Sequence, residues 1–107
     1  MATAAQYGIN VITVVYNNSA LATIRMHQEA QYPNRPSGTD FANPDFAALG
    51  TAYRALGIQV TRDNEFLPAL KEALQANRPA LIEVMTELEA ISPTATLSQV
   101  TAGQPGR

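Results

Sequence analysis

The hydrophobic residues of this chain gather in short runs separated by more polar segments. The runs are "NVITVVY" at 10–16, "GIQVT" at 57–61 and "PALIEVM" at 79–85. The first and last are apolar at almost every position instead of at alternate ones, which is typical of strands in a parallel sheet covered on both faces. We therefore predict three strands in these ranges.

The first part of the chain carries two predicted helices. Residues 2–7 favour a helix, and Gly8 can end it because glycine accepts a positive φ. A second helix is predicted over 20–30, with the side chain of Asn18 or Ser19 as its N-cap.

Prolines mark the middle of the chain. The segment 32–40 holds two prolines and a glycine, so we predict a loop there. Asn43 followed by Pro44 is typical of the N-cap and first residue of a helix, which Gly57 is predicted to end. The residues predicted to face inward on this third helix share one helical face: Phe46, Leu49, Tyr53 and Leu56.

A fourth helix is predicted from a cap at Asp63 or Asn64 to Ala76. Pro68 is tolerated because the N–H groups of the first turn have no partner within the helix. The residues of this fourth helix that are predicted to face inward are Phe66, Leu67, Leu70 and Leu74.

The resulting order of elements, α-β-α-α-β-α-β, predicts an α/β fold: three layers, α/β/α, with a parallel sheet between the helices. We assign residues 1–91 to this fold. Residues 92–107 are rich in Ser, Thr, Pro and Gly, and we expect a loosely held C-terminal tail.

Composition narrows the class of protein. The chain has 107 residues, no Cys and a net charge of −2, so it offers no disulfide, thiol nucleophile or zinc–thiolate site. The acidic balance argues against nucleic acid and anionic membranes as partners. No apolar run reaches the length of a membrane helix, and the N-terminus lacks a basic signal-peptide region. We expect a soluble, cytoplasmic protein.

Two consecutive amides, Asn17 and Asn18, follow the first strand directly. Ligands of open parallel sheets bind beyond the carboxyl ends of the strands, and the next helix offers free N–H groups that suit phosphate. An Asn oxygen is also an acceptable ligand for Mg²⁺. This position therefore indicates a site for a metal–diphosphate group. The alternative is a plain Asx turn without a ligand.

The other polar residues give no catalytic assignment. His27 is the only histidine and is expected to lie on the surface of a helix. Glu83 is expected at the solvent end of its strand. Four glutamates show no spacing that suggests a pair for acid–base chemistry: Glu29, Glu83, Glu87 and Glu89.

Four separated blocks, "YGINVITVVYNN", "TIRMHQEAQYP", "SGTDFANPDFAALG" and "PALIEV", occur in a characteristic order and spacing. From Ala2 to about Ser98 the chain resembles the C-terminal, diphosphate-binding domain of thiamine-diphosphate-dependent enzymes. It is most similar to the acetolactate synthase and benzoylformate decarboxylase group.

The resemblance implies roles for four residues. In the family a Gly-Asp-Gly motif precedes an Asn-Asn pair, and the Asp, the second Asn and a nearby backbone carbonyl bind the Mg²⁺ that holds the cofactor diphosphate. Carried over, Asn18 and Ala20 are the metal ligands, and Asn17 and Ser19 complete the cofactor-binding turn. Ser19-Ala20 stands where family members often have Gly and Tyr.

The chain also departs from the family pattern. It contains no Gly-Asp-Gly triplet, and the catalytic Glu of the family lies in another, N-terminal domain. We therefore expect an N-terminally truncated fragment that does not itself bind thiamine diphosphate and Mg²⁺. The full-length family uses both to act on C–C bonds of 2-oxo acids, by carboligation or decarboxylation.

The alternative is a non-catalytic α/β module for binding or interaction. In a truncated fragment, removal of the preceding strands should uncover a sheet edge, which predicts a homo-oligomer, and the resemblance implies missing N-terminal domains as partners.

Overall fold

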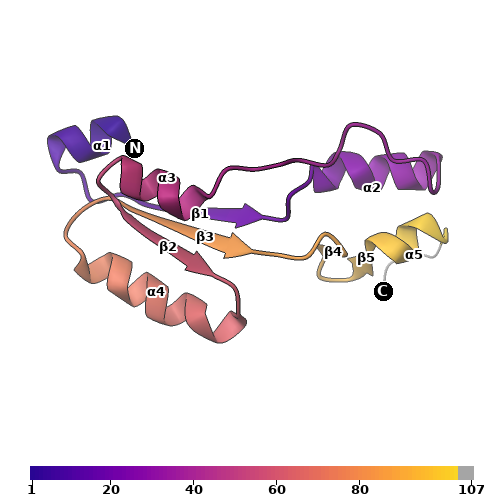
Figure 1. The fold of residues 1–107 in the computed structure, drawn as a ribbon. Coiled ribbons are helices and arrows are strands. Elements are labelled where there is room, and N and C mark those ends of the chain that lie inside the picture. The colour runs from indigo at the N-terminus through magenta and orange to yellow at the C-terminus, as the bar shows by residue number, and fades with distance from the viewer. Residues whose placement is uncertain (104–107) are drawn as a thin grey trace. The chain divides into compact units, whose positions relative to one another are not determined.

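The structure, a computed structural model, describes residues 1–103 and divides the chain into two compact units (Figure 1). The first unit comprises residues 1–17 and 43–85, and the second comprises 18–42 and the described residues from 86 onward. The elements of the first unit are α1 (Ala2–Tyr7), β1 (Ile12–Asn17), α3 (Phe46–Ala52), β2 (Leu56–Val60), α4 (Asp63–Gln75) and β3 (Ala80–Met85). Gly8 ends α1 with a φ of 63°, as its sequence position predicted.

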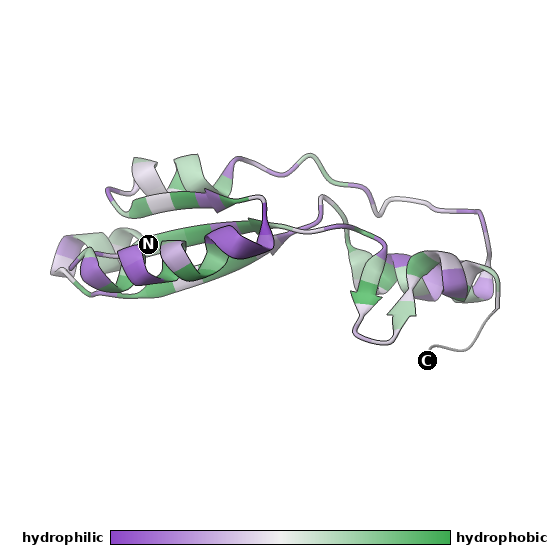
Figure 2. Cartoon of the chain, turned by 90° about the horizontal axis from the view of Figure 1, so that it is seen from below, coloured by the Kyte–Doolittle hydropathy of each residue, from purple (hydrophilic) through white to green (hydrophobic). Residues whose placement is uncertain are grey.

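The first unit is built on a parallel sheet with the strand order β1-β3-β2. The three strands were all predicted from their apolar runs, and their parallel pairing confirms the α/β fold class. β3 lies in the centre, which explains why its first four residues are buried. Figure 2 shows hydrophobic residues along these strands.

Helices α3 and α4 cover opposite faces of this sheet (Figure 1). The core on the α4 side contains Ile82 and Val60, which are 0% and 2% exposed. On the other side α3 approaches the sheet very closely. A Cβ added at Gly57 would collide with the backbone carbonyl of Ala47, so a glycine in β2 allows this contact.

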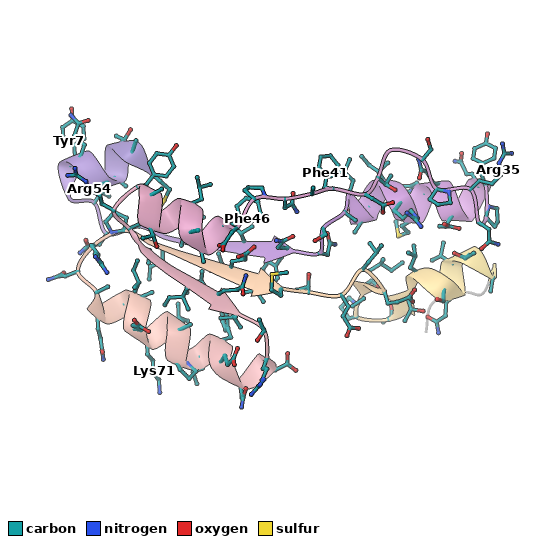
Figure 3. All side chains as sticks on the ribbon, in the orientation of Figure 1. Tyr7, Arg35, Phe41, Phe46, Arg54 and Lys71 are labelled. Atoms are coloured by element: carbon teal, nitrogen blue, oxygen red, sulfur yellow. The ribbon has the colours of Figure 1, made fainter. Side chains whose placement is uncertain are left out.

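The inner face of α4 differs from the prediction. Leu67 and Leu74, predicted to face inward, are 57% and 68% exposed. The residues that face the sheet are Phe66, Ala69, Leu70 and Ala73. The two alanines let the helix backbone approach the strands, whereas Lys71 points away from the sheet (Figure 3).

The capping residues predicted for α3 and α4 are both wrong. Asn43 does not cap α3; Asp45 does, and its side chain accepts a hydrogen bond of 2.7 Å from the N–H of Ala48. Neither Asp63 nor Asn64 caps α4, because Arg62 is the N-cap residue and Asp63 is already the first helical residue. The side chain of Glu65 accepts a hydrogen bond of 3.2 Å from the N–H of Arg62.

The end of α3 also differs from the prediction. The helix stops at Ala52, and Gly57 lies inside β2 instead of ending the helix. Arg54, with a φ of 62°, turns the chain between the two elements.

The second unit contains α2 (Ala22–Gln31), the antiparallel strands β4 (Ala90–Ser92) and β5 (Ala95–Thr96), and α5 (Leu97–Thr101). The expected loosely held tail is therefore wrong for residues 92–103. Thr96 caps α5, and Leu97 is buried. Residues 104–107 of the expected tail lie outside the described part of the chain.

The start of α2 was also predicted wrongly. Leu21 is the N-cap residue, and no side chain, neither that of Asn18 nor that of Ser19, caps the helix. Within residues 1–103, no helix combines the length and hydrophobicity needed to cross a membrane.

Candidate functional site

Asn17 ends β1, and its side chain is almost completely buried in the first unit. Its amide nitrogen donates to Oε1 of Glu83 at 2.7 Å, and its amide oxygen accepts from Nδ2 of Asn43 at 2.9 Å. Both ends of the amide therefore have partners within the protein. Asn17 has the role of a structural anchor at the end of the strand.

Glu83 is the centre of this arrangement, and its predicted place at the solvent end of β3 is wrong. It is 1% exposed, because β3 is the central strand and α3 covers its side chain. It accepts hydrogen bonds from Asn17, from Nε2 of Gln59 at 3.1 Å, and from the backbone N–H groups of Phe46 and Ala47 at the start of α3.

The electrostatics of Glu83 follow from these partners. Burial raises the pKa of its carboxyl, but the hydrogen bonds from Asn17, Gln59 and the two backbone groups outweigh burial and hold the pKa below its ordinary value. The residue is thus ionised at neutral pH although the hydrogen bonds come from neutral groups. We call Glu83 with Asn17, Gln59 and Asn43 the Glu83 cluster.

Sequence reasoning missed this cluster. The pattern contained one signal for it, a single acidic residue inside the otherwise apolar run "PALIEVM". A charge in a strand that is covered on both faces requires hydrogen-bond donors nearby. The identity of those donors depends on strand order, and a strand order is not visible in the run itself.

The next three residues, Asn18 to Ala20, belong to the second unit. The side-chain oxygen of Asn18 accepts from the N–H of Ala20 at 3.1 Å, which forms an Asx turn, and Ser19 has a φ of 55°. Ala20 forms an isolated bridge with Asp40. The Asx turn weighed as an alternative from the sequence is therefore present.

This turn offers oxygen ligands of the kind that Mg²⁺ prefers. An amide oxygen has two lone pairs, so the bond from Ala20 leaves Asn18 able to accept a second contact. The bonds of the Ala20–Asp40 bridge use the carbonyls of Ser19 and Thr39, not that of Ala20. Asn18 and Ala20 could thus provide two neutral ligands. They fit part of a metal site, since Mg²⁺ takes six ligands in near-octahedral geometry.

Carboxylates do not complete such a site within the described residues. There, no group of three or more His, Cys, Asp or Glu side chains could hold a metal ion.

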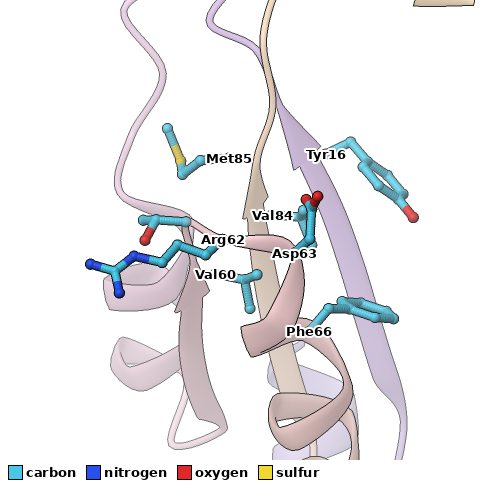
Figure 4. A pocket seen from close by; sticks show the side chains of 8 residues that line it. Tyr16, Val60, Arg62, Asp63, Phe66, Val84 and Met85 are labelled. Atoms are coloured by element: carbon cyan, nitrogen blue, oxygen red, sulfur yellow. The ribbon is translucent and has the colours of Figure 1, made fainter.

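A cavity of about 220 Å³ lies on the α4 side of the same sheet, at the carboxyl ends of the strands (Figure 4). Val60, Val84 and Phe66 give it apolar walls, and Arg62 and Asp63 stand at the start of α4 beside it. It includes none of the residues predicted for the cofactor site.

Comparison with known proteins identifies the family. The family model described as "Thiamine pyrophosphate enzyme, C-terminal TPP binding domain" matches residues 1–84. The acetolactate synthase large subunit of Parasynechococcus marenigrum is 38% identical over 87 residues, which covers 78% of this chain and 14% of that protein.

Two further relatives have similar names. The acetolactate synthase isozyme 3 large subunit of Escherichia coli is 33% identical over 81% of this chain and 16% of its own length. The corresponding large subunit of Haemophilus influenzae is 32% identical over 87% of this chain and 17% of its own length.

The chain spans about one sixth of these relatives, and the match lies in the domain that the sequence blocks indicated. The resemblance inferred from those blocks is thereby confirmed, and with it the use of thiamine diphosphate, also called thiamine pyrophosphate, by full-length members. The chain belongs to the thiamine pyrophosphate enzymes, as a part of their C-terminal TPP binding domain.

Proposed function

We propose that the chain forms part of the cofactor-binding domain of an enzyme that makes or breaks a C–C bond next to a 2-oxo group. The names of the acetolactate synthase relatives support this reaction class. When bound, thiamine diphosphate supplies the nucleophilic carbon and the electron sink for such chemistry, and the protein binds and orients it.

The observation that carries this proposal is that the side chains of Asn17 and Asn18 have different hydrogen-bond partners. Both ends of the Asn17 amide are engaged inside the first unit, whereas the Asn18 oxygen accepts one bond, in the turn that follows β1. We assign Asn18 and the carbonyl of Ala20 to the Mg²⁺ that holds the diphosphate. Asn17 and Ser19 shape the turn, and we assign no catalytic residue to this chain.

We further propose that the 107-residue chain by itself binds the cofactor weakly and turns over no 2-oxo acid. Two neutral oxygens are a poor set of ligands for Mg²⁺, which usually takes one or two carboxylates besides the phosphates. The rest of a longer enzyme is its natural partner in this proposal, and the cytoplasm its location.

Isothermal titration calorimetry with thiamine diphosphate and Mg²⁺ tests the proposal. We expect no micromolar binding by the 107-residue chain. A version extended upstream by the Gly-Asp-Gly segment typical of the family should bind, because it adds the missing carboxylate ligand. Asn18→Ala in the extended version should abolish that binding.

The matched control is Asn10→Ala, which removes an amide that donates an exposed hydrogen bond of 3.0 Å to Asn77. It should leave binding by the extended version unchanged. Micromolar binding by the short chain would contradict the proposed weakness. An extended version that binds equally well with and without Asn18 would contradict the metal assignment and favour a module with another ligand.

A further inference from the structure

The strand β1 has a free edge. It pairs with β3 on one side, and no other strand of the described residues pairs with it on the other side (Figure 1). The N–H of Ala80 in β3 donates to the carbonyl of Val11 at 2.9 Å. Alternate residues of a strand direct their backbone groups to the same neighbour. The backbone groups of Ile12, Val14 and Tyr16 therefore face the free edge.

Nothing in β1 prevents this edge from pairing with another strand. Its six residues, Ile12–Asn17, include no charged residue and no proline, and their register with β3 has no bulge. Edge strands of natural proteins commonly carry such features, because these keep other chains from adding to the sheet. The side chain of Tyr16 is 71% exposed (Figure 4).

The strand at the other end of the sheet, β2, has a less suitable edge. The N–H of Leu56 donates to the carbonyl of Pro79 at 2.8 Å, so the same alternation leaves Gly57 and Gln59 facing outward. The charged Arg62 follows this strand closely. β2 thus offers two outward residues beside a charge, whereas β1 offers three without one.

We propose that β1 pairs with the β1 strand of a second copy of the chain, antiparallel and about a two-fold axis at Val14. Val14 then lies opposite Val14 of the second copy, and Ile12 lies opposite the second copy's Tyr16. Each pair exchanges two backbone hydrogen bonds, because all of these residues direct their backbone groups outward. The aliphatic–aromatic pairs add stability, and a strand without charges brings no like charges together.

A two-fold pairing closes on itself, so it forms a dimer and not a filament. Two strands of six residues make a small contact compared with the roughly 1,200 Å² of a stable interface, so the dimer is weak. The outward residues of β1 include none of the residues assigned to the cofactor. The pairing therefore goes beyond the proposed function and is tested separately from it.

Sedimentation velocity of charged variants tests the two-fold axis. Val14→Lys and Val14→Glu should each lose the concentration-dependent association of the unaltered chain, because like charges would lie opposite each other. An equal mixture of the two variants should recover association, because a lysine then faces a glutamate. Leu67→Lys is the matched control: Leu67 is also an exposed apolar residue, but it lies on α4, and the substitution should leave association unchanged.

Chemical cross-linking tests the register without placing a charge in the strand, so it applies even if a charged variant does not fold. The chain has no Cys, so a single introduced thiol reports one position. With a short bismaleimide, Val14→Cys should give a product of twice the mass in denaturing electrophoresis, whereas Gln59→Cys on the edge of β2 should not. Ile12→Cys mixed with Tyr16→Cys should cross-link, since these residues lie opposite each other in the antiparallel pair.

Three results would overturn the proposal. The first is an unaltered chain that sediments as a monomer at the highest concentration reached. The second is a mixture of folded Val14→Lys and Val14→Glu that stays monomeric while the unaltered chain associates. The third is cross-linking of Gln59→Cys that equals that of Val14→Cys, which would assign the association to β2.

Discussion

The two units of this chain both contain a buried glutamate, but they stabilise it in different ways. Glu83 in the first unit accepts only from neutral donors and lies in a sheet whose other face is an apolar core. Glu29 in the second unit accepts from the N–H of Asn34 at 2.7 Å and pairs with Arg25 at 3.2 Å. One unit is thus organised by a sheet and the other by a polar network.

The difference extends to the number of apolar residues that each unit buries. Among the described residues of the second unit, Leu97 is the one hydrophobic residue below a tenth exposed, beside the polar Glu29 and Thr39. The first unit buries a cluster around Ile82. Burial of apolar surface is the main favourable term in folding, so we infer that the first unit supplies most of the stability of the chain.

The largest expected effect follows from this inference. Ile82→Ala should lower the free energy of unfolding by about 2 to 5 kcal/mol, because it leaves a cavity at a site with no exposure. Leu97→Ala should lower the free energy of unfolding by less, and the loss should be confined to the second unit. Denaturant titration measures the free energy of unfolding of each variant, and amide hydrogen exchange shows in which unit the stability is lost. Leu67→Ala, on the exposed face of α4, is the control and should stay within about 0.5 kcal/mol. A larger effect of Leu97→Ala than of Ile82→Ala would contradict the ranking.

Acid should weaken the first unit through Glu83. The pKa of Glu83 is held below its ordinary value in the folded state, so its stabilising contribution is present above the pKa of the unfolded chain and is lost as pH falls through the lower pKa of the folded state. Denaturant titrations between neutral and strongly acidic pH should show this loss.

Two comparisons sharpen that prediction. Glu83→Gln should make unfolding less dependent on acid, at the expense of stability at neutral pH. The pKa of Glu29 is shifted in the same direction. The hydrogen bond from Asn34 lowers it most, and this bond, with those from Thr101 and Arg25, outweighs the effect of burial, which raises it. Glu29→Gln should therefore also reduce the acid dependence. An unchanged pH profile in Glu83→Gln would show that this carboxylate is not the responsible group.

The smallest expected effect is weak self-association, and we propose that the first unit is its origin. β1 is an edge strand, and Tyr16 on it is 71% exposed. Edge strands with apolar residues pair with other chains. Sedimentation should show a homo-oligomer that increases with concentration and decreases in Tyr16→Lys. A monomer at high concentration that binds no hydrophobic dye would contradict this proposal.

The sequence by itself determined the family and the order of the elements from α1 to β3, but not β4, β5 and α5, which follow them. Apolar runs of five to seven residues indicated the three strands of the sheet, and four motif blocks indicated the thiamine pyrophosphate enzymes. These signals are local, since a strand that is covered on both faces must be apolar along its length wherever its neighbours come from. The turn at Gly8 was predicted for the same reason, because only its own φ mattered.

Tertiary structure alone decided the capping residues and the inner face of α4. Asn43 looks like a helix cap in the sequence, yet its side chain donates to Asn17, which is 26 residues away. The helix then begins at Phe46, after Asp45, the next residue able to cap it. Likewise Leu67 and Leu74 fit a helical stripe, but the close approach of α4 to the sheet selects the smaller Ala69 and Ala73.

The environment of Glu83 is the clearest case. Nothing in "PALIEVM" states that Asn17, 66 residues earlier, and Gln59, 24 residues earlier, will meet at one carboxylate. That meeting depends on the strand order β1-β3-β2, which places Glu83 between the other two strands, and on α3, which covers it. Whether a charge in a strand is exposed or buried depends on its neighbours in space, and those are fixed only when the sheet assembles.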